Sequence, residues 1–593
     1  MNHRRHFAAS QLVCTIVLSI AACLAQCVAA EPASTGPRSS ASTPRAAALA
    51  ELQDYSLEGM SRRLGPTYDF YHRQSKAEEF SEIWMAPVKT GPGKRHWEIG
   101  GPWTSAAGDF SSTQGQVLYV PDKGEFPVDR VTILEWSNGC FTESPEPPWH
   151  GGFRPEPASA KWKQAVTDGD VGIPLAMARG MGYWSNNGLA IFSSGLVAAA
   201  GTVTARGKEP TFHFPASKLP LAISITNKSE FALVTVHDLE RHVGQVAVFS
   251  LGVNGKKNNF VHEWQDDAWS LPNVAMLEGI KLLGYVDLPN LEFPTGICAV
   301  GNKLGGRMNG RDGNAGVLKE YDLAKQADRD VFNTGNNADF SSTAGFAVVI
   351  GKYENKAAFL DLRPLFAGSR IANFTTEANY QKTRDSGPGP NQWPYTFEAQ
   401  PRWKPSVVKM IGVPHPTAVI ASMTGGPAAR ALIASVDGTV GIYAVGGLTG
   451  DGPATAAGIG KVGVVKVGRN PICLTYQKLS YDTVIAVSRG DRELSWIKYT
   501  DPRPQVIRRL RDARMLDPVF AEVSDTHGIE TSLLTVADFT GRKIINYRYS
   551  RVVFATQGGA KFGMGPDGKD EFECGGEMEL PGSPLSISAS NVN

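Results

Sequence analysis

Two histidines and two acidic residues lie within six positions in the segment HDLERH, which runs from His237 to His242. Imidazole nitrogens and carboxylate oxygens are ligands that zinc takes in proteins. A zinc site on one segment would normally need the i, i+4 spacing of a helix or a third ligand nearby, and the sequence around HDLERH offers neither. We therefore predict a solvated loop here and assign no metal ligand, with a metal site as the competing interpretation.

Further charged residues follow short apolar runs along the chain. The candidate ligand-binding residues are His237, Asp238, Lys352, Asp437, Arg489, Asp491 and Asp538, accompanied by Glu354, Arg542, His415, Arg469 and Asp517. Acids and bases mixed in this way suit a polar ligand, or a divalent cation held by Asp and His. The competing interpretation, which we favour for any single residue, is that Asp and Gly in tight turns satisfy local backbone groups.

The sequence does not identify a cofactor, and calcium is the candidate that two of its turns offer. The segments GRMNGRDGNAG (306–316) and GPDGKDEFE (565–573) are turns rich in oxygen-bearing side chains, but they lack the spacing and the terminal Glu of an EF-hand loop. The sequence also has no GxSxG elbow, Walker loop, HExxH motif or dinucleotide GxGxxG. An enzyme is not excluded, because a site can be assembled from single residues that leave no local motif.

The elements that position these residues are short strands. Val-, Ile- and Phe-rich runs at 231–236, 245–249, 346–350, 431–436, 483–487 and 532–536 are typical of strands. Helical periodicity is nearly absent, and the best helix candidate is 317–332.

The strands belong to a sequence repeat. Each repeat consists of a proline, an apolar strand, a polar gap, a second strand, a charged or Gly-rich turn and a third strand. Copies begin at Pro174, Pro220, Pro294, Pro416, Pro471, Pro518 and Pro584. The shortest separations match the roughly 40 to 50 residues of a four-stranded propeller blade. We predict an all-β, seven-bladed β-propeller, with six or eight blades as alternatives.

The copy at Pro584 has room for only one strand before the sequence ends, so we expect the two ends of the chain to meet in one sheet. The runs 116–120 and 130–136 are suitable partners. Cys140 and Cys574 both flank this closing blade and are a candidate disulfide, with two unpaired thiols as an equal alternative. Cys298 and Cys473 fall in first strands, where a small buried apolar role is expected.

Some repeats resemble a known family. The segments ALIASVDGTVGIYAV (431–445) and FALVTVHDLERHVGQVAVFSL (231–251) resemble the YVTN-type repeat, which is found in bacterial surface propellers and in lactonase-like propeller enzymes. The literal YVTN tetrad is missing and none of that family's catalytic residues can be placed on the sequence. The resemblance therefore implies only the fold and an exported location.

The first 30 residues resemble an export signal, with Arg4 and Arg5 followed by an apolar stretch and a small-residue cleavage site before Glu31. A lipoprotein attached at Cys23 is the alternative. Residues 31–75 are expected to be a disordered linker with one short helix, and 76–593 the propeller, with insertions at about 254–288, 302–340 and 368–404.

Charge and hydropathy exclude some partners. Lys and Arg number 59 and Asp and Glu 58 in the 593 residues, so nucleic acid is not expected as a partner. No second apolar run is long enough for a transmembrane segment in the mature chain. We predict a periplasmic or extracellular binding module of the bacterial cell envelope that takes a protein, glycan or small-molecule ligand. The alternative is a hydrolase or lactonase-like enzyme with its site at the channel mouth, either with or without a metal ion.

Overall fold

The chain folds predominantly into antiparallel strands. A computed structural model describes residues 114–121, 133–137, 154–155, 174–179, 188–200, 211–227, 230–254, 269–270, 279–302, 323–333, 341–384, 394–421, 429–450, 452–476, 482–500, 503–524, 532–549, 572–580 and 582–589. In these ranges no helix is long and apolar enough to cross a membrane. The expected signal, the linker and the two candidate calcium turns lie outside them, apart from Phe572 and Glu573.

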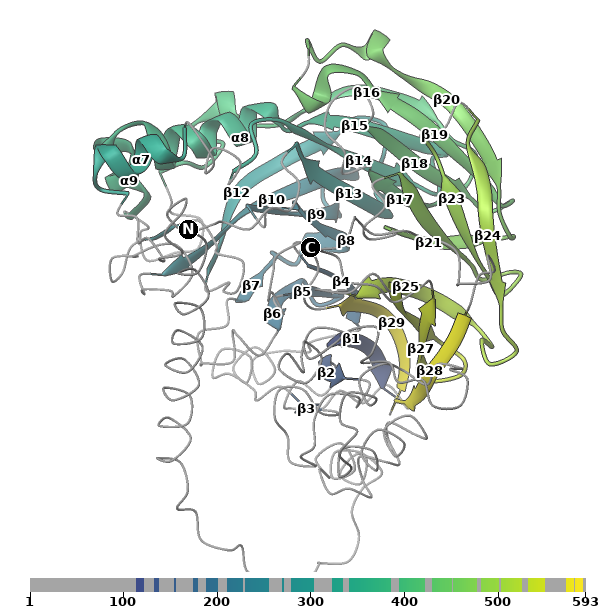
Figure 1. Cartoon of the computed structure of the whole chain (residues 1–593). Coiled ribbons are helices and arrows are strands. Elements are labelled where there is room, and N and C mark those ends of the chain that lie inside the picture. The colour runs from purple at the N-terminus through teal and green to yellow at the C-terminus, as the bar shows by residue number, and fades with distance from the viewer. Residues whose placement is uncertain are drawn as a thin grey trace, which may run out of the picture. The chain divides into compact units, whose positions relative to one another are not determined.

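The described strands form seven sheets (Figure 1). One sheet consists of β4 (Pro174–Arg179), β5 (Gly188–Phe192), β6 (Leu196–Ala200) and β7 (Thr211–His213). The next consists of β8 (Lys218–Ile225), β9 (Phe231–Asp238), β10 (Val243–Asn254) and β12 (Gly279–Leu288), and the short β11 (Trp269–Ser270) also pairs with β10. The expected insertion 254–288 thus ends in β12, the fourth strand of its sheet.

The next four sheets repeat the same strand order. They are β13 (Gly296–Gly301), β14 (Gly345–Gly351), β15 (Lys356–Asp361) and β16 (Ser406–Gly412); β17 (Pro416–Ala421), β18 (Arg430–Ser435), β19 (Thr439–Val445) and β20 (Ile459–Lys466); β21 (Pro471–Tyr476), β22 (Thr483–Ser488), β23 (Glu493–Lys498) and β24 (Gln505–Arg511); and β25 (Pro518–Ser524), β26 (Ser532–Asp538), β27 (Lys543–Tyr549) and β28 (Phe572–Glu579).

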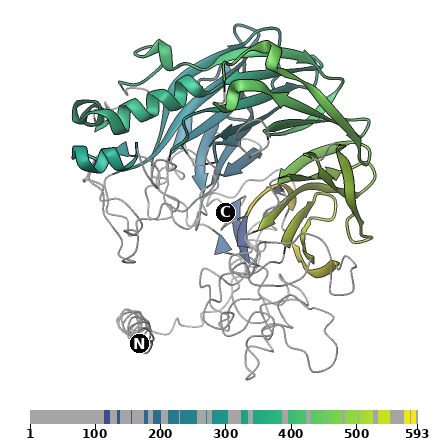
Figure 2. The same ribbon diagram turned by 45° about the horizontal axis from the view of Figure 1, so that its top comes forward.

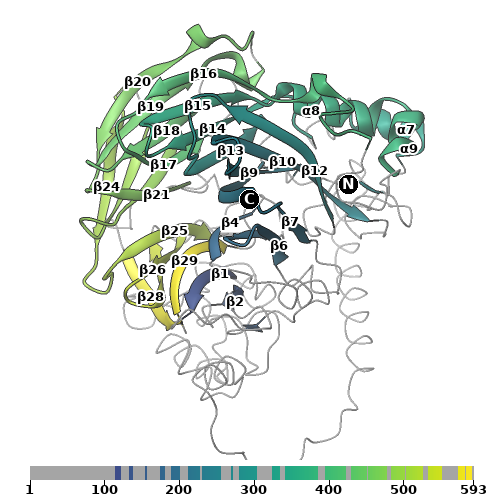
Figure 3. The same ribbon diagram turned by 180° about the vertical axis from the view of Figure 1, so that it is seen from behind.

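The two ends of the described chain share the remaining sheet. The last strand, β29 (Gly582–Ala589), pairs antiparallel with β1 (Gln114–Pro121), which continues to β2 (Ile133–Ser137) and β3 (Arg154–Pro155). Figures 1 and 3 show β29 beside β1 from opposite sides. The predicted meeting of the two chain ends in one sheet is therefore confirmed.

First strands of successive sheets lie against one another. The contacts run in the order β4, β8, β13, β17, β21, β25 and β29, and β29 in turn contacts β4. Small sheets whose first strands meet in a closed series form a propeller, because each sheet hides its faces only against its neighbours. The predicted all-β propeller fold is confirmed.

The recurrent proline marks these first strands for a physical reason. Proline lacks an N–H and is tolerated on the edge of a sheet or at a bulge. The register shifts directly after Pro174, Pro416, Pro471 and Pro518, each the first residue of a first strand at the edge of its sheet, and after Pro220, the third residue of β8. The proline at the start of each sequence repeat therefore indicates a bulged strand at the edge of a sheet.

The core lies between neighbouring sheets. Every residue of β9, β14 and β22 is buried, whereas the outer strands β20 and β24 carry several exposed side chains. One apolar cluster joins Ile420 and Leu432 to Val484 and Ile497 of the next sheet. Second strands are apolar on both faces because both faces are covered.

Helical segments occur in the connections between strands. They are α7 (Gln326–Val331), α8 (Arg363–Arg370), the π-helical η4 (Ile371–Thr375), α9 (Glu377–Arg384) and the 3-10 turns η5 (Pro401–Trp403), η7 (Gly446–Thr449) and η8 (Ala456–Gly458). The predicted helix at 317–332 is present only as α7 within the described residues. Figure 2 shows the teal helices grouped at one side of the sheets.

Trp403 and the cysteines act as core residues. The Trp403 ring is buried and stacks on Tyr395 at 4.9 Å between centroids. Gly368 of α8 permits this packing, since a Cβ there would lie 2.3 Å from the Trp403 ring. Cys473 is buried in β21, and Cys298 lies in β13, as expected for first strands. Cys140, the predicted disulfide partner of Cys574, lies outside the described residues.

Candidate functional site

One end of the sheets gathers the loops that carry the candidate residues. In each antiparallel sheet, the turn between the second and third strands lies at the same end as the loop leading into the first strand. These loops are hydrogen-bonded from one sheet to the next: Asn470 N–H donates to the Val436 carbonyl and Val436 N–H to the His415 carbonyl. We call this end the turn face, comprising the turns 239–242, 352–355, 436–438, 489–492 and 539–542 and the leading loops 289–295, 413–415, 467–470 and 512–517.

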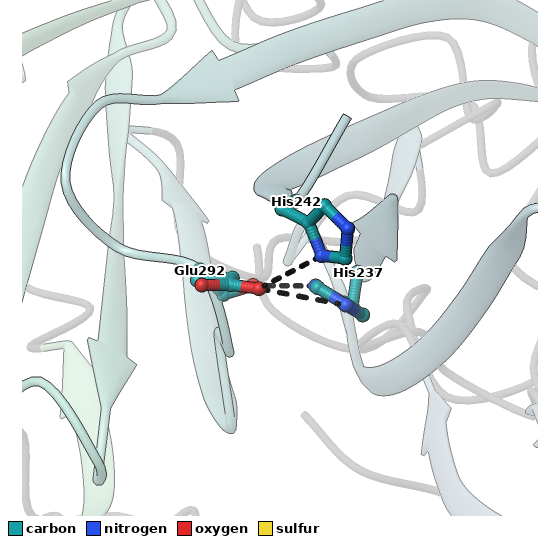
Figure 4. Close-up of side chains that lie close together, drawn as sticks. All are labelled: His237, His242 and Glu292. Atoms are coloured by element: carbon teal, nitrogen blue, oxygen red, sulfur yellow. Dashed lines mark hydrogen bonds and ion pairs between the residues drawn. The ribbon is translucent and has the colours of Figure 1, made fainter. Parts of the chain in front are cut away.

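Three side chains with metal-ligating atoms converge on the turn face. His237 is at the end of β9, His242 is in the following turn, and Glu292 is in the leading loop of the next sheet. Glu292 Oε1 lies 3.8 Å from His237 Nε2 and 3.6 Å from His242 Nδ1, and the three ligand atoms lie within 4.8 Å of one another (Figure 4). Within the described part of the chain they form the one such cluster of three.

His237 is held in one orientation. Its side chain is 4 % exposed, and its Nδ1 lies 3.1 Å from the backbone carbonyl of Glu292. A carbonyl can only accept, so Nδ1 is the donor in this contact, and Nε2 is the ring nitrogen that faces the Glu292 carboxylate. The ring also stacks on Phe293, with 4.3 Å between ring centroids. His237 is thus the rigid member of the cluster.

His242 is the exposed member. Its side chain is 74 % exposed and its backbone is left-handed, with φ of 52°. Asn355, Arg492 and Arg542 have the same backbone conformation at the matching position of their turns. The conformation is therefore a property of the blade turn, and it fixes the direction in which the His242 side chain leaves the chain.

The leading loop that carries Glu292 is fastened at two points. Glu354 Oε1 accepts the backbone N–H groups of Glu292 and Phe293, at 3.1 and 2.9 Å. Gly244 N–H donates to the Leu291 carbonyl at 3.1 Å, and a Cβ on Gly244 would lie 2.2 Å from that oxygen. Only glycine allows this approach, so the start of β10 and the turn 352–355 together fix the position of Glu292.

Asp238 and Asp538 lie at the ends of second strands and are buried. Asp238 pairs with Lys218 and accepts the N–H groups of Glu240 and Arg241, both at 3.1 Å. Asp538 accepts the N–H groups of Asp517 at 3.1 Å and of Gly541 at 2.7 Å. Both carboxylates cap turn backbone, the role that the competing interpretation assigned to them.

Asp437 and Lys352 are exposed on neighbouring turns. The Asp437 carboxylate accepts three hydrogen bonds: from the Thr439 hydroxyl at 2.7 Å, from the Thr439 backbone N–H at 2.9 Å and from Lys466 Nζ at 3.1 Å. The Thr439 hydroxyl, then its N–H and Lys466, lower the pKa of Asp437 to about 2. The Lys352 N–H donates to Thr295 Oγ1 at 3.2 Å.

Arg489 and Asp491 take part in ion pairs with leading loops. Asp491 pairs with Arg469, whose guanidinium lies 2.7 Å away, and the hydrogen bond from Arg469 lowers the pKa of that carboxyl. Arg489 reaches Asp517 in the leading loop of the next sheet, with Arg489 Nη2 2.7 Å from Asp517 Oδ2. These pairs join the turns into a rigid surface. Whether the seven candidate residues bind a ligand stays a prediction.

Glu292 is the member of the cluster that the sequence analysis missed. The sequence nevertheless indicates its position. Glu292 lies two residues before Pro294, just as the candidate residue Arg469 lies two residues before Pro471. Leading loops share a face with the turns between second and third strands. If this rule is applied to every sequence repeat, it places Glu292 on the same face as His237.

Comparisons with known proteins give a fold likeness only. No protein-family model and no curated protein matches the chain. A periplasmic gluconolactonase from Pseudomonas aeruginosa matches with a TM-score of 0.42 at 10 % identity, over 82 % of this chain and 100 % of that one. A protein of unknown function from Desulfotomaculum acetoxidans matches with a TM-score of 0.37 at 9 % identity, over 71 % and 90 %. A protein from Lactobacillus plantarum matches with 0.31 at 9 %, over 69 % and 98 %.

Proposed function

We propose that this chain is an exported binding module of the bacterial cell envelope and that it receives a protein partner on the turn face. The exported location rests on the signal-like first 30 residues. The ring that carries this face we infer to have seven blades, because the described strands fall into seven sheets and their first strands contact one another in a closed series.

The observation that carries the proposal is a set of exposed apolar side chains on the turn face. Leu239, Tyr353, Val436 and Leu516 come from four different loops of this face, and each is between 41 and 72 % exposed. Exposed apolar and aromatic groups surrounded by charge are typical of protein-binding surfaces. Glycans and small molecules are the competing ligands.

The loops that present these groups are already ordered. Arg489–Asp517 and Arg469–Asp491 pairs fasten neighbouring loops, and Tyr353 packs edge-on against Phe293 at 5.9 Å. A surface held in place before binding loses little conformational entropy when a partner docks. The turn face therefore has both the apolar groups and the rigidity of a binding surface.

The experiment compares two sets of exposed apolar residues. One variant carries Ser at Leu239, Tyr353, Val436 and Leu516; the control carries Ser at Val462, Val464 and Ile507, which are exposed on outer strands. Wild-type protein is used to capture its partner from an envelope extract of the source bacterium, and the purified partner is then titrated against all three proteins. We expect the control to bind as wild type and the turn-face variant to lose at least about tenfold in affinity. Equal affinity of the turn-face variant and wild type would refute the proposed surface.

A metal-dependent hydrolase is the second candidate, and the cluster of His237, His242 and Glu292 favours it. Three protein ligands leave a coordination position open for water or substrate, as in catalytic zinc sites. The test is turnover of a panel of lactones and esters by chelator-treated protein with and without added zinc. Zinc-dependent turnover that Glu292→Gln abolishes would favour the enzyme, and no turnover in either state would leave the binding module.

A further inference from the structure

We propose that His237, His242 and Glu292 bind one Zn²⁺ ion. This inference concerns metal binding itself and stands whether the turn face serves a binding module or an enzyme. The donor set is two imidazole nitrogens and one carboxylate oxygen, which suits zinc and its neighbours in the first transition row better than calcium or magnesium, since the latter prefer oxygen alone.

The distances fit an ion at the centre of the cluster. Zinc bonds of roughly 2.0 to 2.2 Å at tetrahedral angles place ligand atoms about 3.3 Å apart. Glu292 Oε1 lies 3.6 Å from His242 Nδ1 and 3.8 Å from His237 Nε2, so small side-chain movements reach that spacing. Both distances exceed the length of a hydrogen bond and lie within the range of an ion pair, and the three ligand atoms lie within 4.8 Å of one another.

The cluster also has the supporting contacts of a metal site. A metal-bound imidazole usually donates its other N–H to a carbonyl or carboxylate, which fixes its tautomer. His237 does so through Nδ1 to the Glu292 carbonyl, so the contact that orients one ligand comes from the residue that supplies another. Glu354 holds the loop of Glu292 through two backbone N–H groups. Ligand and support thus come from the turns of two neighbouring sheets and the leading loop between them.

Exposure indicates an open coordination sphere. His242 is 74 % and Glu292 39 % exposed, while His237 is buried beneath them. Structural zinc sites are closed by four protein ligands, whereas three ligands on a surface leave room for water or for a group from a bound partner. We therefore infer that the ion, once bound, accepts a further ligand from the turn-face side.

The test measures zinc binding by the full mature chain, made without a histidine tag and freed of metal with a chelator. Isothermal titration with ZnCl₂ and competition with a chromogenic chelator give affinity, and elemental analysis gives stoichiometry. The variants are His242→Asn, which keeps a residue that tolerates the left-handed backbone, Glu292→Gln, and Glu354→Ala, which removes the oxygen that accepts the Glu292 and Phe293 N–H groups. The matched control is His415→Asn, another exposed histidine with positive φ on the same face, outside the cluster.

We expect wild type and His415→Asn to bind zinc with the same affinity. His242→Asn and Glu292→Gln should bind zinc at least about tenfold more weakly, and Glu354→Ala about tenfold more weakly although Glu354 is not a ligand. Replacement of zinc by Co²⁺ should give visible absorption bands that change in His242→Asn and not in His415→Asn. Failure of the wild type to bind zinc, or identical zinc affinity in His242→Asn and His415→Asn, would overturn the inference.

Discussion

Ser586 of the last strand pairs with Leu118 of the first described strand, so the two ends of the chain form neighbouring strands of one sheet. Ser586 Oγ also lies 3.4 Å from the carbonyl of Met177 in the adjoining sheet. Ile587 beside it is 1 % exposed. The short C-terminal strand thus belongs to two packing interfaces at once, and it closes the series of first strands.

Removing this strand should open the ring. A chain ending after Pro581 leaves β1 unpaired on one side and exposes the core around Ile587, so we expect its melting temperature to fall by about 10 °C or more, with aggregation. A chain ending after Ala589 keeps β29 and should melt like the full protein. Scanning calorimetry of the three chains decides the matter, and an unchanged melting temperature after loss of β29 would contradict the closure.

The buried cap Asp538 should matter far more for stability than the exposed Asp437. Asp538→Asn replaces an oxygen that accepts backbone N–H groups with an NH₂ group, which leaves buried donors unsatisfied and should cost about 1 to 3 kcal/mol. Asp437→Asn weakens contacts that solvent screens on an exposed turn and should cost less than about 1 kcal/mol. Urea unfolding followed by fluorescence compares them. Equal midpoints for the two variants would show that Asp538 is not a structural cap.

The paired carboxylates predict a loss of stability in acid. The hydrogen bonds from Arg241 and Arg469 lower the pKa values of Asp287 and Asp491, and Thr439 and Lys466 lower that of Asp437 to about 2. Unfolded aspartates titrate near pKa 3.9, so below that pH the unfolded state binds more protons than the folded one. These groups stabilise the fold fully above about pH 5, and their contribution disappears as the pH falls towards about 2. Melting temperatures measured across this range should decrease with acidification; an increase would contradict the assigned pairs.

The thiols give a test of both burial and the proposed disulfide. Burial raises the pKa of Cys473 to about 12 and also raises that of Cys298, so neither should react with a thiol reagent at pH 8 in the folded protein. The chain has seven cysteines, and the predicted cleavage before Glu31 would leave four of them: Cys140, Cys298, Cys473 and Cys574. If Cys140 and Cys574 are bonded, the denatured, unreduced chain has two free thiols, and the reduced chain has four. Four thiols without reduction would remove the disulfide.

The fold could be predicted because its signal is repeated. Proline at the start of a bulged edge strand and an apolar second strand recur often enough to reveal like sheets, even where insertions separate them. The helices α8 and α9 were not predicted, since they occur once and their residues carry no repeat. The final strand at Pro584 could be assigned a partner only because a lone strand needs one.

The site was only half visible in the sequence. His237 and His242 lie five positions apart in the chain, but Glu292 follows only after β10 and β12, and no local spacing in the sequence indicates its contact with them. The charged residues posed the opposite problem. Asp238 and Asp538 look like ligand-binding acids in sequence, yet they cap backbone N–H groups, because a carboxylate suits both tasks and only burial separates them.

The most direct measurement is a crystal structure of the mature chain soaked with ZnCl₂, with anomalous data collected on both sides of the zinc absorption edge. The turn after β9 and the leading loop of β13 should bring His237 Nε2, His242 Nδ1 and Glu292 Oε1 within about 2.0 to 2.2 Å of one anomalous peak on the turn face. Side chains of these residues lying apart, or zinc bound only elsewhere on the protein, would contradict the account.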